Sequence, residues 1–108
     1  MADVDVVTDA DFAERVLAEK LPVLVEFTAD WCPPCRQMAP VLEELARERE
    51  GRLRVVQLDV DRNLETQAAY AVLSMPTFLL FERGRPVKSL VGARAKRRLV
   101  RELGLPEE

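Results

Sequence analysis

Residues 22–38 read PVLVEFTADWCPPCRQM, and they decide the fold class because an apolar run of strand length leads directly into a close pair of cysteines. The run at 22–28 is nearly continuous, which favours a central strand covered on both faces, and Glu26 alone interrupts it. After the cysteines, apolar residues recur at helical spacing over residues 38–45. This pattern predicts a long helix that follows the strand and ends at Gly51.

Strands and helices alternate along the rest of the chain. Further strands are expected at residues 4–7, 53–60, 77–82 and 86–91, and further helices after Thr8, at 63–70 and at 94–103. Thr8 and Asn63 are predicted to cap their helices, and Gly84 to lie at the tip of a hairpin. The order β-α-β-α-β-α-β-β-α implies an α/β fold in which a central mixed sheet of about five strands is flanked by four helices.

The length, composition and charge of the chain limit the classes of function that it can have. A chain of 108 residues with 48% hydrophobic content is expected to form a single domain over residues 1–108. Its net charge of −3 gives no overall attraction to nucleic acid or membrane. Residues 1–20 are acidic and lack a basic leader or a signal-like apolar run, and no later run is long enough to span a bilayer. We therefore expect a cytoplasmic protein; we also expect it to be a monomer.

The cysteine pair restricts the chemistry further. The chain holds two cysteines and no histidine, so one chain cannot supply the four Cys or His ligands of a structural zinc site. Stable disulfides are rare in a reducing cytosol, where a close pair of cysteines is more often redox-active or metal-binding. Redox chemistry is therefore the leading interpretation. A structural disulfide, and a cluster shared between two chains, stay open as alternatives.

Cys32 is expected at the N-terminus of the long helix, where free backbone N–H groups and the helix dipole stabilise a thiolate. Pro33 and Pro34 fit the first helical turn because the N–H groups there have no helical partner. They also remove two donors, so we expect the Cys35 amide and the dipole to be the main support of the Cys32 thiolate. Cys35 is close enough to resolve a mixed disulfide formed at Cys32.

Several motifs together resemble the thioredoxin family. W-C-P-P-C at 31–35 is similar to that family's active site, and further matches are V-L-V-E-F at 23–27, Pro40, M-P-T at 75–77, F-E-R-G-R at 81–85 and V-G-A at 91–93. The resemblance covers essentially the whole chain and implies the thioredoxin fold. It also implies that Cys32 attacks, that Cys35 resolves and that Pro76 is a cis proline facing the pair.

The resemblance implies an apolar rim that receives substrate chains. Its substrate-binding residues would be Trp31, Pro33, Pro34, Val60, Ser74, Met75, Pro76, Val91, Gly92 and Ala93. The backbone of Met75 would pair with substrate chains in a strand-like way. Trp31 would pack beside the sulfurs.

Glu26 stands where the family usually carries an aspartate beneath the second cysteine, which implies a catalytic role as proton acceptor for Cys35. Burial in an apolar strand is expected to raise its pKa, as a proton shuttle at neutral pH requires. Gln57 replaces a common lysine, which removes a counter-charge and is expected to raise the pKa further. The alternative is that Glu26 is a strand residue that points to a polar edge.

The predicted function is a thiol-disulfide oxidoreductase that reduces protein disulfides, is recycled by an NADPH-dependent thioredoxin reductase and binds no cofactor itself. One alternative is a disulfide oxidase or isomerase with a less reducing potential. Another is a non-catalytic binding subunit of the same fold. The basic run over residues 94–101 is interpreted as a solvated helix face rather than a docking site for an acidic partner.

Overall fold

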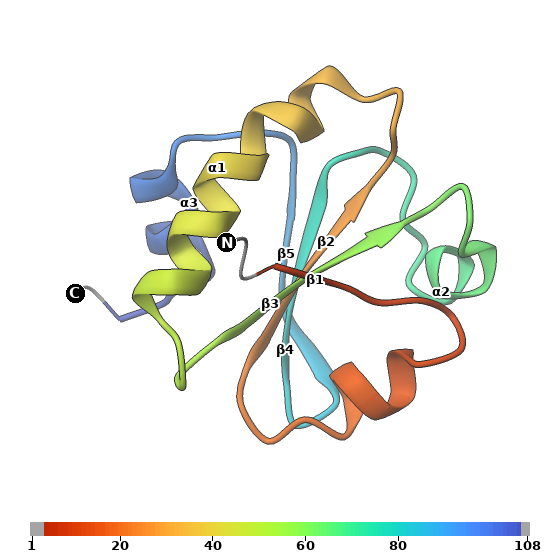
Figure 1. The fold of residues 1–108 in the computed structure, drawn as a ribbon, viewed down its shortest axis with the longest axis horizontal. Coiled ribbons are helices and arrows are strands. Elements are labelled where there is room, and N and C mark those ends of the chain that lie inside the picture. Colours follow the sequence, from red (N-terminus) through yellow and green to blue (C-terminus); the bar gives the residue numbers. More distant parts are fainter. Residues whose placement is uncertain (1–3, 107–108) are drawn as a thin grey trace.

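The computed structural model describes residues 4–106 as a five-stranded mixed sheet between two layers of helices (Figure 1). The strands are β1 (Asp5–Val6), β2 (Val23–Thr28), β3 (Arg54–Asp59), β4 (Thr77–Glu82) and β5 (Arg85–Val91). The helices are a short π-helix η1 (Ala13–Leu17), α1 (Pro33–Glu48), α2 (Leu64–Ala69) and α3 (Lys96–Leu103). The observed element order confirms the predicted α/β class. None of the helices within 4–106 is long and apolar enough to cross a membrane.

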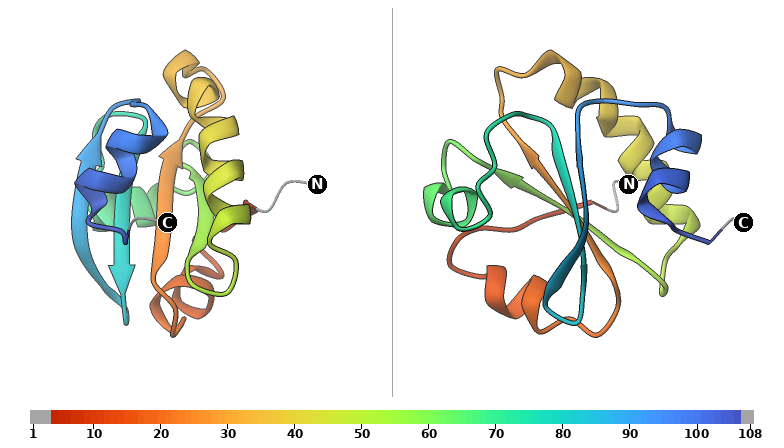
Figure 2. Two further views of the ribbon diagram at one scale, coloured as in Figure 1. Left: turned by 90° about the vertical axis from the view of Figure 1, so that its left-hand side faces the viewer. Right: turned by 180° about the vertical axis from the view of Figure 1, so that it is seen from behind.

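The strands lie in the order β1-β3-β2-β4-β5, so β2 is central. It pairs in parallel with β3 and antiparallel with β4. Two views from opposite sides place α1 and α3 together over one face, and η1 and α2 over the other (Figures 1 and 2). Successive side chains of β2 therefore enter different cores: Leu24 packs with Met38 and Leu42 of α1, whereas Val25 lies in the other cluster.

The first helix begins later than predicted. The prediction that Thr8 caps it is wrong: the Thr8 N–H donates to Asp11 Oδ1 over 2.7 Å, and the helical residues are Ala13–Leu17. The apolar side of this helix faces the core, since Phe12 and Val16 are buried.

The cap of α2 also differs from the prediction. Asn63 precedes the helix but makes no side-chain cap; its Oδ1 accepts the Asp9 N–H over 2.8 Å. The carboxylate of Asp9 instead accepts the backbone N–H groups of Glu65 and Thr66 over 3.2 and 2.9 Å. Two of the free N–H groups in the first turn of α2 are thus satisfied from a segment far away in the sequence.

The predicted hairpin is confirmed, with β4 and β5 joined at Arg83 and Gly84. Both turn residues have positive φ, 52° and 81°, as a two-residue turn of the favoured hairpin type requires. A Cβ on Gly84 would lie 2.9 Å from the carbonyl oxygen of Leu17. Glycine is therefore needed at this position both for the turn and for its contact with the end of η1.

The basic run at the start of α3 is only partly the solvated face that was predicted. Lys96 bonds to Glu44 and Glu48 of α1 and so joins the two helices of this layer. The side chain of Arg94 is 10% exposed, so for this residue the prediction is wrong. Its contacts are described below.

Candidate active site

The cysteine pair lies where the central strand passes into the longest helix. β2 ends at Thr28 and α1 begins at Pro33, so Cys32 is the N-cap residue of α1, as predicted. Cys32 and Cys35 are joined in a disulfide with their Cα atoms 5.3 Å apart. The structure therefore describes the oxidised form of the pair.

The environment of Cys32 favours a thiolate. The backbone N–H of Cys35 donates to Cys32 Sγ over 3.2 Å, while the two prolines occupy the first helical positions and have no N–H to offer. The positive end of the α1 dipole adds to this stabilisation. Cys32 is 2% exposed and Cys35 3%, so the N-cap position, rather than exposure, distinguishes the two sulfurs.

Glu26 is fully buried, so the alternative that it points to a polar edge is wrong. Burial raises its pKa from 4.5 to about 7, against the lowering effect of a hydrogen bond from Gln57. That bond runs from Gln57 Nε2 to Glu26 Oε1 over 2.8 Å, and Oε2 has no hydrogen-bond partner among the described residues. The pKa of Glu26 is thus raised, as the sequence predicted, and it lies in the range that suits proton transfer at neutral pH.

Strand alternation places Glu26 on the α1 side of the sheet. Its neighbour two residues earlier, Leu24, packs against Met38 and Leu42 of α1, and residues two apart on a strand share a face. Cys35 lies in the first turn of the same helix. The Cys35 side chain itself, however, packs in the other buried cluster, together with Cys32 and Val25.

Trp31 does not simply pack beside the sulfurs. It is 62% exposed, and its indole Nε1–H donates to Asp61 Oδ2 over 2.7 Å. Asp61 follows β3, whose parallel neighbour β2 leads to Trp31. Asp61 was not predicted from the sequence, although its place after a neighbouring parallel strand could have indicated it, because the carboxyl ends of such strands meet at one edge.

Two loops from the other half of the chain come together. We call residues 74–76 the proline loop and residues 91–93 the rim loop. The Met75–Pro76 peptide bond is cis, as the resemblance implied, and the Gly92 N–H donates to the Pro76 carbonyl over 2.8 Å. Met75 packs against the buried cluster that contains both cysteines.

The predicted rim residues differ in accessibility. Those on the surface are Trp31, Pro33, Pro34, Ser74, Val91 and Ala93, with Met75 and Gly92 partly exposed. Pro76 is buried. Val60 is 1% exposed and belongs to the cysteine cluster, so its side chain lies beneath the rim rather than on it. Leu73, which was not among the predicted site residues, is 88% exposed beside the proline loop.

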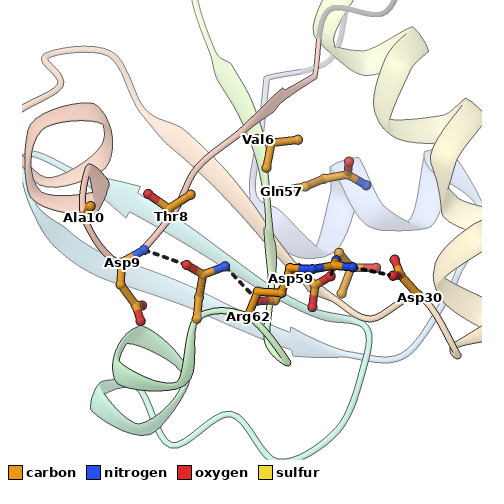
Figure 3. Close-up of a pocket in the computed structure, with 10 residues that line it drawn as sticks. Val6, Thr8, Asp9, Ala10, Asp30, Gln57, Asp59 and Arg62 are labelled. Carbon is orange, nitrogen blue, oxygen red and sulfur yellow. Dashed lines mark hydrogen bonds and ion pairs between the residues drawn. The ribbon is translucent and has the colours of Figure 1, made fainter.

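A cavity of about 580 Å³ opens at the ends of β1 and β3 (Figure 3). Its lining includes Gln57, the partner of Glu26, and Thr28 at the end of β2. Asp30 forms an ion pair with Arg62 over 3.3 Å at its border. Through Gln57, this cavity reaches the neighbourhood of the buried carboxyl group.

Comparisons with known proteins agree with this geometry. A family model described as Thioredoxin matches residues 3–104. The chain belongs to the thioredoxin family. A thioredoxin of Mycobacterium tuberculosis (strain ATCC 25618 / H37Rv) is 56% identical over 97 residues, covering 90% of this chain and 84% of that protein. A thioredoxin of Alicyclobacillus acidocaldarius subsp. acidocaldarius is 48% identical over 96 residues, covering 89% and 90%.

One longer relative is named for two activities. The bifunctional thioredoxin reductase/thioredoxin of Mycobacterium leprae (strain TN) is 52% identical over 97 residues, which cover 90% of this chain and 21% of that protein.

Membership of the thioredoxin family and the cysteine pair at disulfide distance define the activity. The chain is a thiol-disulfide oxidoreductase with a redox-active Cys32–Cys35 centre, and it acts as a protein-disulfide reductase. The oxidase, isomerase and non-catalytic alternatives are not favoured.

Proposed function

We propose that the chain reduces protein disulfides with Cys32 as the attacking thiol, Cys35 as the resolving thiol and Glu26 as the proton acceptor. One observation carries the division between the sulfurs: Cys32 is the N-cap of α1, and its sulfur accepts the Cys35 N–H over 3.2 Å. The same donor and the helix dipole would stabilise a thiolate at Cys32 in the reduced protein, and the thiolate is the nucleophile in disulfide exchange.

The reaction has two exchange steps. The Cys32 thiolate attacks one sulfur of the substrate disulfide; the Cys32–substrate bond forms, the substrate S–S bond breaks, and the released substrate thiolate takes a proton. Cys35 then loses its proton, attacks Cys32 Sγ and forms the disulfide seen in the structure. The mixed disulfide breaks, and the second substrate sulfur leaves as a thiolate that takes a proton. Two electrons pass to the substrate, and the cysteine pair becomes oxidised.

Glu26 would take the Cys35 proton in the second step. The support is its complete burial, its place in the layer of α1 and a pKa of about 7 that allows both gain and loss of a proton near neutrality. The cavity at Gln57 offers a route by which that proton exchanges with solvent.

Substrate chains would lie across the proline loop and the rim loop. Within residues 4–106 the backbone N–H and C=O of Met75 take part in no hydrogen bond, so both can pair with an extended substrate segment. The exposed side chains of Trp31, Val91 and Leu73 supply apolar contacts. Pro33, Pro34, Ser74 and Ala93 complete the accessible surface, and the buried Val60 and Pro76 support it from below.

A thioredoxin reductase that uses NADPH would return the pair to the dithiol. Support comes from the mycobacterial relative whose name joins a thioredoxin reductase to a thioredoxin. We further propose that residues 1–108 act as one domain and one monomer in the cytoplasm, where the reducing environment suits this reaction. The net charge of −3 fits a protein that binds neither nucleic acid nor membrane.

The test is reduction of insulin with dithiothreitol or with a thioredoxin reductase and NADPH. We expect turnover by the parent chain, none by Cys32→Ser, and accumulation of a mixed disulfide with Cys35→Ser. Turnover that persists in Cys32→Ser would overturn the assignment of the nucleophile. Equilibration with glutathione separates the alternatives: a reductase stays more reducing than the glutathione couple, whereas an oxidase or isomerase does not.

A further inference from the structure

Arg94 directly follows the rim loop, and its side chain turns back onto that loop. The guanidinium Nε donates to the Gly92 carbonyl over 3.2 Å, and a second nitrogen donates to the Val91 carbonyl. A third nitrogen bonds to the carboxylate of Glu102. Although arginine is normally a surface residue, this side chain is only 10% exposed.

Glu102 gives Arg94 a fixed point on α3. Its carboxylate also accepts a hydrogen bond from Arg98 Nε over 2.8 Å. Hydrogen bonds from Arg98 and from Arg94 hold the pKa of Glu102 below its usual value, so the group stays ionised at neutral pH. The helix is itself anchored, because Leu99 and Leu103 are buried in the core beside α1.

The opposite side of the rim loop is held by the proline loop. Gly92 adopts a left-handed backbone conformation with φ 102°, and its N–H donates to the Pro76 carbonyl over 2.8 Å. Val91 pairs with Thr77 in the sheet. The rim loop is therefore fixed on one side by backbone contacts and on the other by a single side chain.

Arginine suits this place because its planar guanidinium carries five donors in a fixed arrangement. It bonds two consecutive carbonyls and a carboxylate at once, which a lysine ammonium on a flexible stem cannot reproduce with the same geometry. With both carbonyls turned toward Arg94, the Val91 side chain remains 58% exposed on the rim.

We infer that Arg94 is a positioning residue for substrate recognition: it links α3 to the rim loop and holds that loop in the form that receives protein substrates. The inference rests on the proposed role of the rim. A preorganised loop does not have to be ordered when a substrate binds, so less affinity is lost. A small disulfide that reaches only the sulfurs gains nothing from the loop, whereas a protein segment that crosses the rim does.

The test compares a protein substrate, insulin, with a small one, dithionitrobenzoate, in the full chain. We expect Arg94→Met to raise the KM for insulin about tenfold, the effect of one lost charge-assisted hydrogen bond, and to leave kcat and dithionitrobenzoate reduction within about twofold of the parent. Arg94→Lys keeps the charge, so its KM for insulin is expected to lie between the KM of the parent and that of Arg94→Met. Glu102→Gln removes the fixed point and is expected to raise KM in the same direction.

Arg98→Met is the matched control, because it also removes an arginine from Glu102 but touches no rim carbonyl. We expect its KM for insulin to stay within about twofold of the parent. An unchanged KM in both Arg94→Met and Glu102→Gln would overturn the inference, as would an equal loss with both substrates. Either result leaves the proposed function standing, since that depends on loss of all turnover in Cys32→Ser.

Discussion

Gln57 donates a hydrogen bond from Nε2 to Oε1 of Glu26 over 2.8 Å, and the two residues are direct partners in the pairing of β3 with β2. Gln57 is partly exposed and lines the cavity at the edge of the sheet, whereas Glu26 is fully buried. A neutral amide is thus the link between the buried carboxyl group and solvent. Since the amide brings no positive charge, burial dominates and the pKa of Glu26 is raised.

The first prediction concerns stability against pH. With the pKa of Glu26 raised from 4.5 to about 7, the folded state keeps a proton that the unfolded state releases. The free energy of unfolding should therefore fall as pH rises from 4.5 through about 7, by about 3 kcal/mol in all. We expect Glu26→Gln to remove this fall and to be more stable than the parent above pH 7, as measured by urea denaturation across the pH range.

Glu14→Gln serves as the control for this experiment, because Glu14 is an exposed glutamate on η1. It should retain the parental dependence on pH. A fall of the same size in Glu26→Gln would show that another group governs the profile.

The second prediction concerns the charge at position 57. Gln57→Lys places a positive charge beside Glu26, so the pKa of Glu26 should drop below 7, by about one unit or more. Gln57→Leu removes the hydrogen bond without adding charge, so the pKa should rise instead. Carbon NMR titration of the side-chain carboxyl gives the pKa directly. If Glu26 accepts the Cys35 proton, the pH at which the mixed disulfide resolves should move in the same direction in each variant.

If the pKa of Glu26 is the same in the parent, in Gln57→Lys and in Gln57→Leu, the contact between Gln57 and Glu26 has no electrostatic effect. A pKa that moves while the resolution step keeps its pH dependence would instead remove Glu26 from the proton transfer.

The elements that carry local signals could be predicted from the sequence. The strand predicted at 53–60 is observed at Arg54–Asp59, and the hairpin around Gly84 is found where its turn residues indicated. The helix after the cysteines also agrees, since apolar spacing and first-turn prolines are properties of the local sequence.

Contacts between distant segments could not be predicted in this way. Asp9 directly follows Thr8, the predicted cap of the first helix, but it caps α2 because the two segments meet only in the folded chain. Arg94 was included in a solvated face, since spacing alone does not show that Gly92 turns its carbonyl back toward the side chain. Asp61 and Leu73 were missed for the same reason: an ordinary charged or apolar residue gains its role from neighbours remote in sequence.

The third prediction concerns the prolines between the cysteines. An N-cap side chain accepts from the second or third N–H of its helix, and here only the third position, Cys35, has one to give. Pro34→Ala restores the N–H of the second position. We expect the pKa of Cys32 to fall by about one unit and the pair to become less reducing, because the thiolate of the reduced form gains a donor.

Pro33→Ala is the matched control, since it restores an N–H at the first helical position, which does not bond an N-cap side chain. Thiolate absorbance measures the pKa of Cys32, and equilibration with glutathione measures the reduction potential of the cysteine pair. A Cys32 pKa that changes equally in both variants would contradict this explanation and would point to loop stiffness instead.

The fourth prediction concerns the loss of stability when alanine replaces a glycine. It separates the cost of a left-handed backbone from the cost of a steric contact. Gly84 and Gly51 have nearly the same φ, 81° and 82°, but a Cβ on Gly84 would lie 2.9 Å from the Leu17 carbonyl, whereas a Cβ on Gly51 would meet nothing within 4 Å. Gly51→Ala should therefore lose about 1 kcal/mol of stability from the left-handed backbone alone. Gly84→Ala should lose about 3 kcal/mol, because the hairpin tip must also move away from η1. Urea denaturation of both variants checks the difference, and equal losses would mean that the tip of the hairpin yields to the added methyl group without cost.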